Sequence, residues 1–305
     1  MKYAFVKESL SEYSISVACC ALDVSRSGYY AWLDRPASAR AVRRKALAVK
    51  IHAAHAAGRC VYGSPRVHAA LLAESAAASD QESSAGADAR SQDSVICCVN
   101  TVARVMREQG LRAKTRRAFV PRTTDSAHQK RIAGNLLDRQ FAADLPDQKW
   151  AVDITYIATQ EGWLYVAGVL DLCSRKIVGW SMAEHMETDL IADALKMAIV
   201  RRSPGTGLLH HSDRGVQYAS DAYQHLLSMH DMKVSMSGKG DCWDNACMES
   251  FWSTLKTELV HHEKYATRDQ ARASIFEYIE VFYNRVRLHS SLGYVSPDTF
   301  EAALN

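Results

Sequence analysis

The sequence predicts an α/β protein: a mixed five-stranded sheet with flanking helices, preceded by a small all-α domain of helix-turn-helix character. Stretches 149–158, 163–172 and 175–183 are rich in β-branched and aromatic residues and are joined by short turns. That pattern is typical of an antiparallel meander. Short strands near 207–211 and 232–236 then alternate with helices, whereas the first third of the chain shows helical patterns only.

The helices follow from apolar spacing and from capping residues. Residues 14–33 outline a helix-turn-helix, or an ordinary helical hairpin, with Asp23 and Ser25 available as caps. Residues 40–58 and 100–109 are also expected to be helical. In the α/β part the expected helices are 188–202, 219–229, 245–259 and about 267–283.

These elements suggest four regions. The tract 74–94 consists of small and polar residues and lacks large apolar side chains, so we expect a flexible insertion there. The regions are a helical DNA-binding region with that insertion (1–111), a basic linker (112–147), the α/β core (148–264), and a C-terminal helix and tail (265–305).

Composition excludes several classes of protein. The chain has 305 residues, of which 48% are hydrophobic and 23% charged, as expected of a folded globular protein. Its longest uncharged apolar run, about 163–170, is too short to span a bilayer, and no secretory signal precedes it. We therefore expect a cytoplasmic protein without a membrane partner. The eight cysteines form no C-x-x-C pair, which indicates reduced thiols; a zinc site at His52, His55 and Cys60 is the alternative.

Positive charge is concentrated in two runs, although the net charge is only +3. Residues 35–50 contain six basic residues and no acid, and residues 112–131 contain seven basic residues and one acid. A single run of this kind is usually a solvated surface. Two runs favour a polyanionic partner such as nucleic acid. The expected contacts in the second run are Arg112, Lys114, Arg116 and Arg117.

Three acidic residues stand at informative positions. Asp153 lies inside the first expected strand, Asp213 directly follows a later strand, and Glu249 lies on the helix after it. The intervening segments contain 59 and 35 residues. With 34 acidic residues in the chain this spacing is weak evidence, and each acid could equally be a solvated or capping carboxylate. If the three converge, they stay ionised only around a cation, and oxygen ligands select Mg²⁺ or Mn²⁺.

The same helix contains a lysine on the face of Glu249. Lys256 follows Glu249 by seven residues, so the two side chains share one side of the helix. This arrangement would place an ammonium group beside the metal, where it could meet a phosphate. A plain surface Glu–Lys face is the alternative.

At this point a family resemblance becomes specific. The stretches WAVDITYI, HSDRGVQYAS and NACMESFWSTLKTEL resemble the three catalytic motifs of the retroviral-integrase-like transposases, whose signature is the 35-residue gap. The tail YNRVRLHSSLGYVSP, and YGSPRVHAAL near the N-terminus, resemble the second-frame product (OrfB) of the insertion sequence three family. The resemblance covers nearly the whole chain.

The resemblance implies an RNase H-like core with a DDE motif. Asp153, Asp213 and Glu249 would be catalytic residues and ligands of Mg²⁺, bound as a pair of ions, with Mn²⁺ as a substitute. Lys256 would contact DNA near the cleavage site. Three further motif positions are expected to support this site and contact DNA: His210, Arg214 and Asn245.

The implied function is DNA transposition by a polynucleotidyl transferase. Cleavage at the element end frees a 3′-OH, which then attacks a second phosphodiester, by a copy-out route through a circular intermediate. The expected partners are double-stranded DNA with terminal inverted repeats, the upstream-frame product that carries a leucine zipper, and further copies of this chain on the bacterial nucleoid. The insertion at 74–94 departs from the family pattern. The alternatives are an RNase H-type nuclease and a non-catalytic DNA-binding regulator derived from a transposase.

Overall fold

The computed structural model describes residues 2–83, 97–115, 132–238 and 242–304. The chain forms two compact units, residues 1–52 and 53–305, and the boundary falls within helix α4 (Ala39–Ala57). Among the described residues, no helix is long and apolar enough to cross a membrane.

The N-terminal unit contains the expected helix pair. Helices α2 (Ile15–Ala21) and α3 (Arg26–Leu33) begin at serine caps, whose side chains accept hydrogen bonds from backbone N–H groups: Ser14 from Val17 and Ser25 from Gly28. Asp23 is not a cap, because it adopts a left-handed conformation in the turn between the helices (φ 51°).

The N-terminal unit also includes α1 (Lys2–Ser9), which the apolar pattern did not indicate. Val6 of α1 packs with Ala18, Cys19 and Tyr29 to form the small core of this unit. Without α1 the two later helices would leave that apolar surface exposed, so the unit is a three-helix cluster.

The helical part of the second unit contains α5 (Ser64–Ser83) and α6 (Val99–Glu108). Helix α6 agrees with the expected helix to within a residue at each end. Helix α5, in contrast, continues through 74–83, where the sequence suggested a flexible tract. Alanine has the highest intrinsic helix propensity, so this Ala-rich stretch continues the helix even though it lacks large apolar side chains. The remainder of that tract, 84–94, lies outside the described residues.

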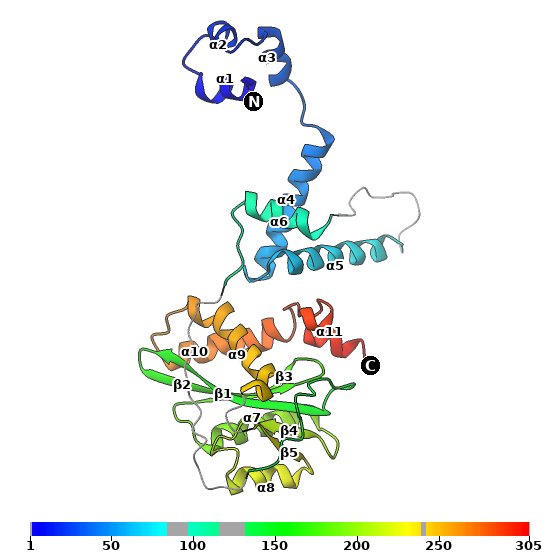
Figure 1. The fold of residues 1–305 in the computed structure, drawn as a ribbon, viewed down its shortest axis with the longest axis vertical. Helices are drawn as coiled ribbons and strands as arrows, with labels where there is room; N and C mark the ends of the chain where they lie inside the picture. The colour runs from blue at the N-terminus through cyan, green and yellow to red at the C-terminus, as the bar shows by residue number, and fades with distance from the viewer. Residues whose placement is uncertain (1, 84–96, 116–131, 239–241, 305) are drawn as a thin grey trace. The chain divides into compact units, whose positions relative to one another are not determined.

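The α/β part is built on one five-stranded sheet in the order β3-β2-β1-β4-β5 (Figure 1). Strands β1, β2 and β3 form an antiparallel meander, and β4 and β5 are parallel to β1. The bounds are β1 (Lys149–Thr159), β2 (Gly162–Asp171), β3 (Ile177–Ala183), β4 (Leu209–Ser212) and β5 (Lys233–Met236). This arrangement confirms the predicted mixed five-stranded sheet.

Helices cover both faces of the sheet (Figure 1). Helices α7 (Thr188–Arg202) and α8 (Asp221–Met229) lie on one face, and α9 (Ala246–Glu258) and α10 (Arg268–Glu277) lie on the other. Beyond α10 the chain continues as a π-helical segment (Tyr278–Tyr283), and α11 (Pro297–Ala302) follows near the end. Three short 3₁₀ turns complete the elements: Cys242–Asn245, Val260–His262 and Ser290–Leu292.

The main core lies between the sheet and helices α7 and α8. Trp150 and Val152 point into it from β1, and Leu195 packs against them from α7. Gly179 on β3 permits the close approach of α7, because a Cβ there would lie 2.2 Å from the carbonyl oxygen of Ala194. Since side chains alternate along a strand, Asp153 is directed to the opposite face, which α9 covers.

Candidate active site

Asp153 lies where the sheet opens. β1 pairs with the parallel strand β4 only as far as Ala151, whereas its antiparallel pairing with β2 continues through the position where Asp153 faces Gly168. The carboxylate therefore lies beside the point where β4 diverges from β1. Its Oδ1 accepts a hydrogen bond from the backbone N–H of Ile154 at 2.8 Å.

Asp213 lies at the end of strand β4. It is the first residue after β4, at the carboxyl end of a strand parallel to β1, which is where α/β sheets present groups to ligands. Its Oδ1 accepts the backbone N–H of Gly215 at 2.8 Å, which fixes the carboxylate within a tight turn. β1 and the end of β4 thus bring Asp153 and Asp213 together.

Helix α9 packs directly over Asp153, because the residue that faces Asp153 on the neighbouring strand β2 is a glycine. A Cβ on Gly168 would lie 3.0 Å from the ring of Trp252, so the indole occupies the space that a side chain would otherwise fill. The start of α9 is attached to β1 by Asn245, whose side-chain amide donates to the carbonyl oxygen of Val152 at 3.1 Å. Glu249 lies in the first turn of this helix and is exposed.

The electrostatics show that these acids interact. Burial raises the pKa of Asp153 well above its ordinary value, and the charge of Asp213 raises it further; Glu249 has a smaller effect in the same direction. Within the described parts of the chain, no three His, Cys, Asp or Glu side chains are close enough to form a ready-made metal site. The charges of Asp153 and Asp213 therefore influence one another strongly, and Glu249 has the weaker effect on Asp153.

Lys256 lies near the same carboxylates. Its Nζ is 5.1 Å from the centre of the Tyr156 ring, a cation–π contact between α9 and β1. Burial lowers the pKa of Lys256, and the charge of Asp153 partly offsets that effect. The structure thus brings Lys256 within electrostatic range of Asp153, as the helical spacing suggested.

The other three motif residues support the site from within the fold. His210 is fully buried on β4, where its Nε2 is 2.9 Å from the hydroxyl of Tyr223 on α8. It has no exposed surface with which to contact DNA, contrary to the expectation from the motif. Arg214 donates from Nε to the carbonyl oxygen of Ser237, and Asn245 is 6% exposed, so both serve to hold loops around the carboxylates.

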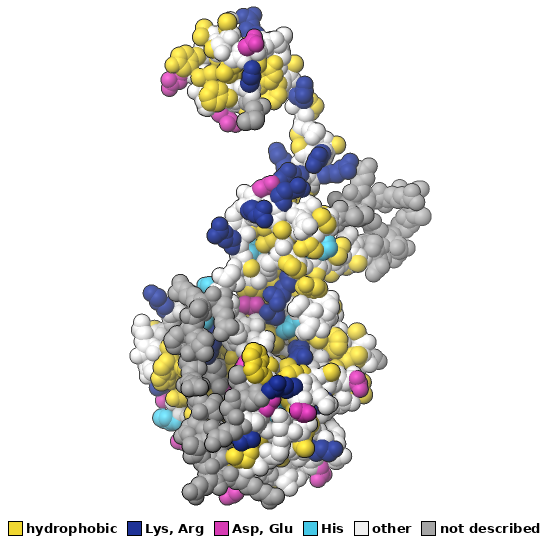
Figure 2. Space-filling view, viewed as in Figure 1, with side chains coloured by type: hydrophobic (Ala, Val, Ile, Leu, Met, Phe, Trp, Pro, Cys, Tyr) yellow, Lys and Arg dark blue, Asp and Glu magenta, His cyan; other side chains and the backbone are white. Residues whose placement is uncertain are grey.

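The expected basic contacts fall in different environments. Arg112 is exposed, and the exposed Arg104 and Arg107 on α6 lie a short distance before it in the chain; Figure 2 shows basic side chains gathered over the helical region. Lys114 instead donates from Nζ to the carbonyl oxygen of Glu258 at 3.0 Å, so it links this segment to the end of α9. Arg116 and Arg117 lie outside the described residues.

Sequence reasoning did not single out Tyr218, although it lies within the stretch HSDRGVQYAS. Its side chain is 2% exposed, and its hydroxyl makes no hydrogen bond with any described residue. Burial raises its pKa well above the ordinary value, and the charges of Asp153 and Asp213 raise it further. No feature of the sequence distinguishes this tyrosine from the others of the core.

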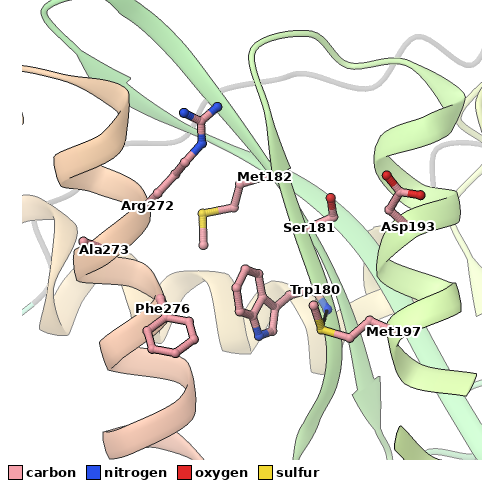
Figure 3. Close-up of a pocket in the computed structure, with 8 residues that line it drawn as sticks. All are labelled: Trp180, Ser181, Met182, Asp193, Met197, Arg272, Ala273 and Phe276. Carbon is pink, nitrogen blue, oxygen red and sulfur yellow. Dashed lines mark hydrogen bonds between the residues drawn. The ribbon is translucent and has the colours of Figure 1, made fainter. Parts of the chain in front are cut away.

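A separate pocket lies between β3, α7 and α10 (Figure 3). The rings of Trp180 and Phe276 and the side chain of Met182 form its apolar part, with Asp193 and Arg272 at its sides. It contains none of the predicted catalytic residues, so it is not the candidate active site.

Comparison with protein families gives matches along most of the chain. Residues 143–242 and 230–297 match two models described as integrase core domain. Residues 42–119 match an HTH-like domain. The HTH-like match therefore covers the helical region around α4, α5 and α6 rather than the earlier helix pair at 14–33.

Comparison with solved structures gives weak matches to retroviral proteins. The integrase catalytic core domain of HTLV-2 in complex with magnesium is 15% identical, with a TM-score of 0.40 over 52% of this chain and 98% of that chain. The simian T-cell lymphotropic virus intasome in complex with the PP2A regulatory subunit B56 gamma is 14% identical, with a TM-score of 0.44 over 68% of this chain and 67% of that one.

Curated relatives match almost end to end. Transposase InsF for insertion sequence IS3A of Escherichia coli K12 is 43% identical over 303 residues, which is 99% of this chain and 98% of the relative. The IS600 uncharacterized 31 kDa protein of Shigella sonnei is 42% identical over 282 residues, which is 92% of this chain and 96% of the relative. These matches confirm the resemblance found in the motifs, and the chain belongs to the IS3 family of insertion-sequence transposases, with an integrase core domain of RNase H-like fold.

Proposed function

We propose that this transposase is a polynucleotidyl transferase whose catalytic residues are Asp153, Asp213 and Glu249. The observation that carries the proposal is the coupled pair of Asp153 and Asp213 beneath α9, the helix that also holds Glu249 and Lys256. The charge of Asp213 helps to raise the pKa of the partly buried Asp153, and a bound cation would remove this repulsion between the two carboxylates.

The donor set fits divalent magnesium, with manganese as a substitute. Asp153, Asp213 and Glu249 offer only carboxylate oxygens, the ligands that these hard cations prefer. A bound pair of ions would lower the pKa of an attacking water and neutralise charge on the leaving oxygen. Glu249 is exposed and lies in the first turn of its helix, so its side chain can turn toward the two aspartates and complete the set.

The residues of the chain then act on two successive phosphodiesters. In the first step water attacks the phosphorus at the element end, the P–O3′ bond breaks, and a 3′-OH is freed. In the second step that hydroxyl attacks a phosphodiester elsewhere, forms a new P–O3′ bond, and releases another 3′-OH. Lys256 binds a phosphate oxygen beside the carboxylates. Trp252 over Gly168 excludes water from the inner side of Asp153.

A strand-transfer assay tests this assignment. The protein is incubated with labelled element-end duplex and Mg²⁺, and products are separated by length. Cleavage that frees a 3′-OH, followed by joining to a second duplex, supports the proposal. Hydrolysis without joining would indicate an RNase H-type nuclease, and DNA binding without either product would indicate a non-catalytic regulator.

We also propose that end recognition is shared with a partner. The helix pair at 14–33 contains one arginine and no asparagine or glutamine, and base readout relies mainly on such side chains. No sustained heptad pattern occurs in the sequence. The active form is then a fusion with the upstream-frame product, assembled as a homo-oligomer on terminal inverted repeats in the bacterial cytoplasm, where the nucleoid lies.

The partner proposal is tested by comparing the 305-residue chain with the fused product on paired inverted-repeat ends at matched salt. The fusion should bind the ends specifically and join them, and the short chain should bind weakly. Equal specificity and equal joining by the short chain would contradict the proposal.

A further inference from the structure

Two motifs that lie far apart in the sequence meet within the second unit. Tyr62 belongs to the stretch YGSPRVHAAL, at the start of the helical region, and Val286 and Leu288 belong to the tail YNRVRLHSSLGYVSP. The Tyr62 hydroxyl donates to the carbonyl oxygen of Val286 at 3.1 Å and accepts the backbone N–H of Leu288 at 3.0 Å. Arg66 donates from Nε to the carbonyl oxygen of Leu288 at 2.9 Å. We call these two side chains and the tail turn 286–288 the joint.

The joint is packed tightly around the ring of Tyr62. The side chain is 3% exposed, and a Cβ on Gly58 would lie 2.5 Å from the ring. Beside it, Arg59 forms an ion pair with Glu277 of α10 and lies 4.6 Å from the centre of the Phe282 ring. The helical region is therefore attached to the C-terminal segment by polar, ionic and aromatic contacts together, which leaves little freedom at this connection.

The joint is connected to the catalytic helix. Arg287, in the middle of the tail turn, donates to both carboxylate oxygens of Glu258, the last residue of α9. Nη1 of Arg66 is 3.9 Å from the same carboxylate, and Lys114, which follows α6, donates to the carbonyl oxygen of Glu258 at 3.0 Å. The beginning of α5 and the segment after α6 therefore both contact the end of the helix that carries Glu249.

This connection is short on the scale of DNA. Glu249 lies nine residues before Glu258, which corresponds to about 14 Å along the helix axis. Successive phosphates of one DNA strand are about 3.4 Å apart along the duplex axis. If α6 holds DNA through its exposed Arg104 and Arg107, a movement of a few Å at the joint would bring a neighbouring phosphodiester to the carboxylates.

We propose that the joint sets the register of cleavage: it fixes DNA bound by the helical region relative to the catalytic carboxylates and so selects the phosphodiester that is cut. Tyr62 and Arg66 are positioning residues, because they act through the tail turn and α9. This role rests on the proposed function, since it requires that Asp153, Asp213 and Glu249 cut DNA that the helical region holds.

Mapping of the new 3′ ends to the nucleotide tests this role. The full chain is incubated with labelled element-end duplex and Mg²⁺. Tyr62→Phe combined with Arg66→Met keeps the ring and the aliphatic chain but removes the three hydrogen bonds to the tail turn. The wild type should cut at one phosphodiester. The double variant should also cut at neighbouring ones, a shift of about 3.4 Å or more along the duplex, and Tyr62→Phe alone should do so to a smaller extent.

Arg202→Met is the matched control. Arg202 on α7 donates to Asp147 and to Glu301 of α11, so its loss removes comparable contacts outside the joint. It should lower stability and total cleavage but leave the position of the cut unchanged. If the joint variants likewise cut more slowly at the wild-type bond alone, their role is structural and the proposal is refuted. Hydrogen exchange at the Leu288 N–H should be faster in Tyr62→Phe, and an unchanged rate would also refute the proposal.

Asp153→Asn distinguishes this proposal from the catalytic assignment. If it abolishes cleavage while the joint variants keep the wild-type position, only the role of the joint is refuted. If it cuts as well as the wild type, the catalytic assignment fails whatever the joint variants do. If the wild type itself does not cut, both fail.

Discussion

Breaking the ion pair between Glu258 and Arg287 should destabilise the unit that contains the active site. The two side chains are 7% and 5% exposed. Arg287 donates to both carboxylate oxygens of Glu258, at 2.8 and 2.7 Å, and the Tyr278 hydroxyl donates at 2.8 Å. Nη1 of Arg66, from α5, is 3.9 Å from the same carboxylate. Burial opposes the charge of Arg287, but its hydrogen bonds to Glu258 outweigh burial and raise its pKa.

The magnitude follows from what each substitution leaves behind. Arg287→Met removes the bidentate partner and leaves Glu258 buried with one hydroxyl donor and a distant guanidinium. Removing one member of such a pair costs about 3–5 kcal/mol, because the remaining charge is uncompensated. Replacing both, as in Glu258→Leu with Arg287→Met, removes the stranded charge and should recover most of that loss.

The assay is urea unfolding of the four proteins of this double-mutant cycle, followed by circular dichroism. We expect each single variant to lose several kcal/mol and the double variant to lose much less than their sum. If Arg287→Met lowers the free energy of unfolding by less than about 1 kcal/mol, the reasoning is refuted, because an ion pair with so small a contribution behaves as a solvated surface pair. Glu258 ends the helix that contains Glu249 and Lys256, so destabilising this pair should also reduce strand transfer.

Three further predictions concern the charged and titratable groups of the chain. Burial lowers the pKa of His210 to about 3, of His211 to about 4 and of His289 to about 3. The unfolded chain therefore binds more protons, and stability that is fully present at about pH 8 should fall by about 1.4 kcal/mol per histidine at about pH 5.5. Chemical unfolding at both pH values checks this, with the exposed His230→Gln as a control; a pH-independent midpoint would contradict it. Mg²⁺ or Mn²⁺ should restore strand transfer after EDTA, whereas Ca²⁺ should support binding only; rescue by Zn²⁺ alone would rule out the carboxylate site. Combined Arg112→Ala, Arg116→Ala and Arg117→Ala should reduce the slope of log affinity against log salt by up to about 0.9 per lost phosphate contact, and an unchanged slope would show that these residues do not bind the backbone.

Much of the fold could be predicted from local patterns. Each strand of the meander and helix α7 agree closely with the sequence, because their residues alternate or repeat with one side toward the same core. Two elements were missed for physical reasons. Helix α1 has little apolar pattern, and its helicity depends on packing Val6 into the small core. Residues 74–83 are helical through alanine propensity, a signal that the polar composition obscured.

The candidate site was predictable at the level of residue type and less so at the level of geometry. The charges of Asp213 and Lys256 act on or respond to that of Asp153, because strand ends and helix faces follow from sequence periodicity; the catalytic roles of these residues stay a prediction. Gly168 could not be identified, because its role depends on which residue of β2 faces Asp153 and on the indole seated against it. Long-range register of this kind is not encoded in any local pattern. The burial of His210 was missed for the same reason.

The most direct measurement of the central claim is strand transfer by three near-isosteric variants, Asp153→Asn, Asp213→Asn and Glu249→Gln, on one element-end duplex. Each replaces a charged oxygen with an amide and preserves shape, so circular dichroism and DNA binding should match the wild type. Each should lower the rate of joining by roughly a thousandfold or more, as expected when metal-based charge stabilisation worth several kcal/mol is lost. Joining at a near-normal rate by the Glu249→Gln protein would contradict the account, because the exposed first turn of α9 would then contribute no ligand to the reaction.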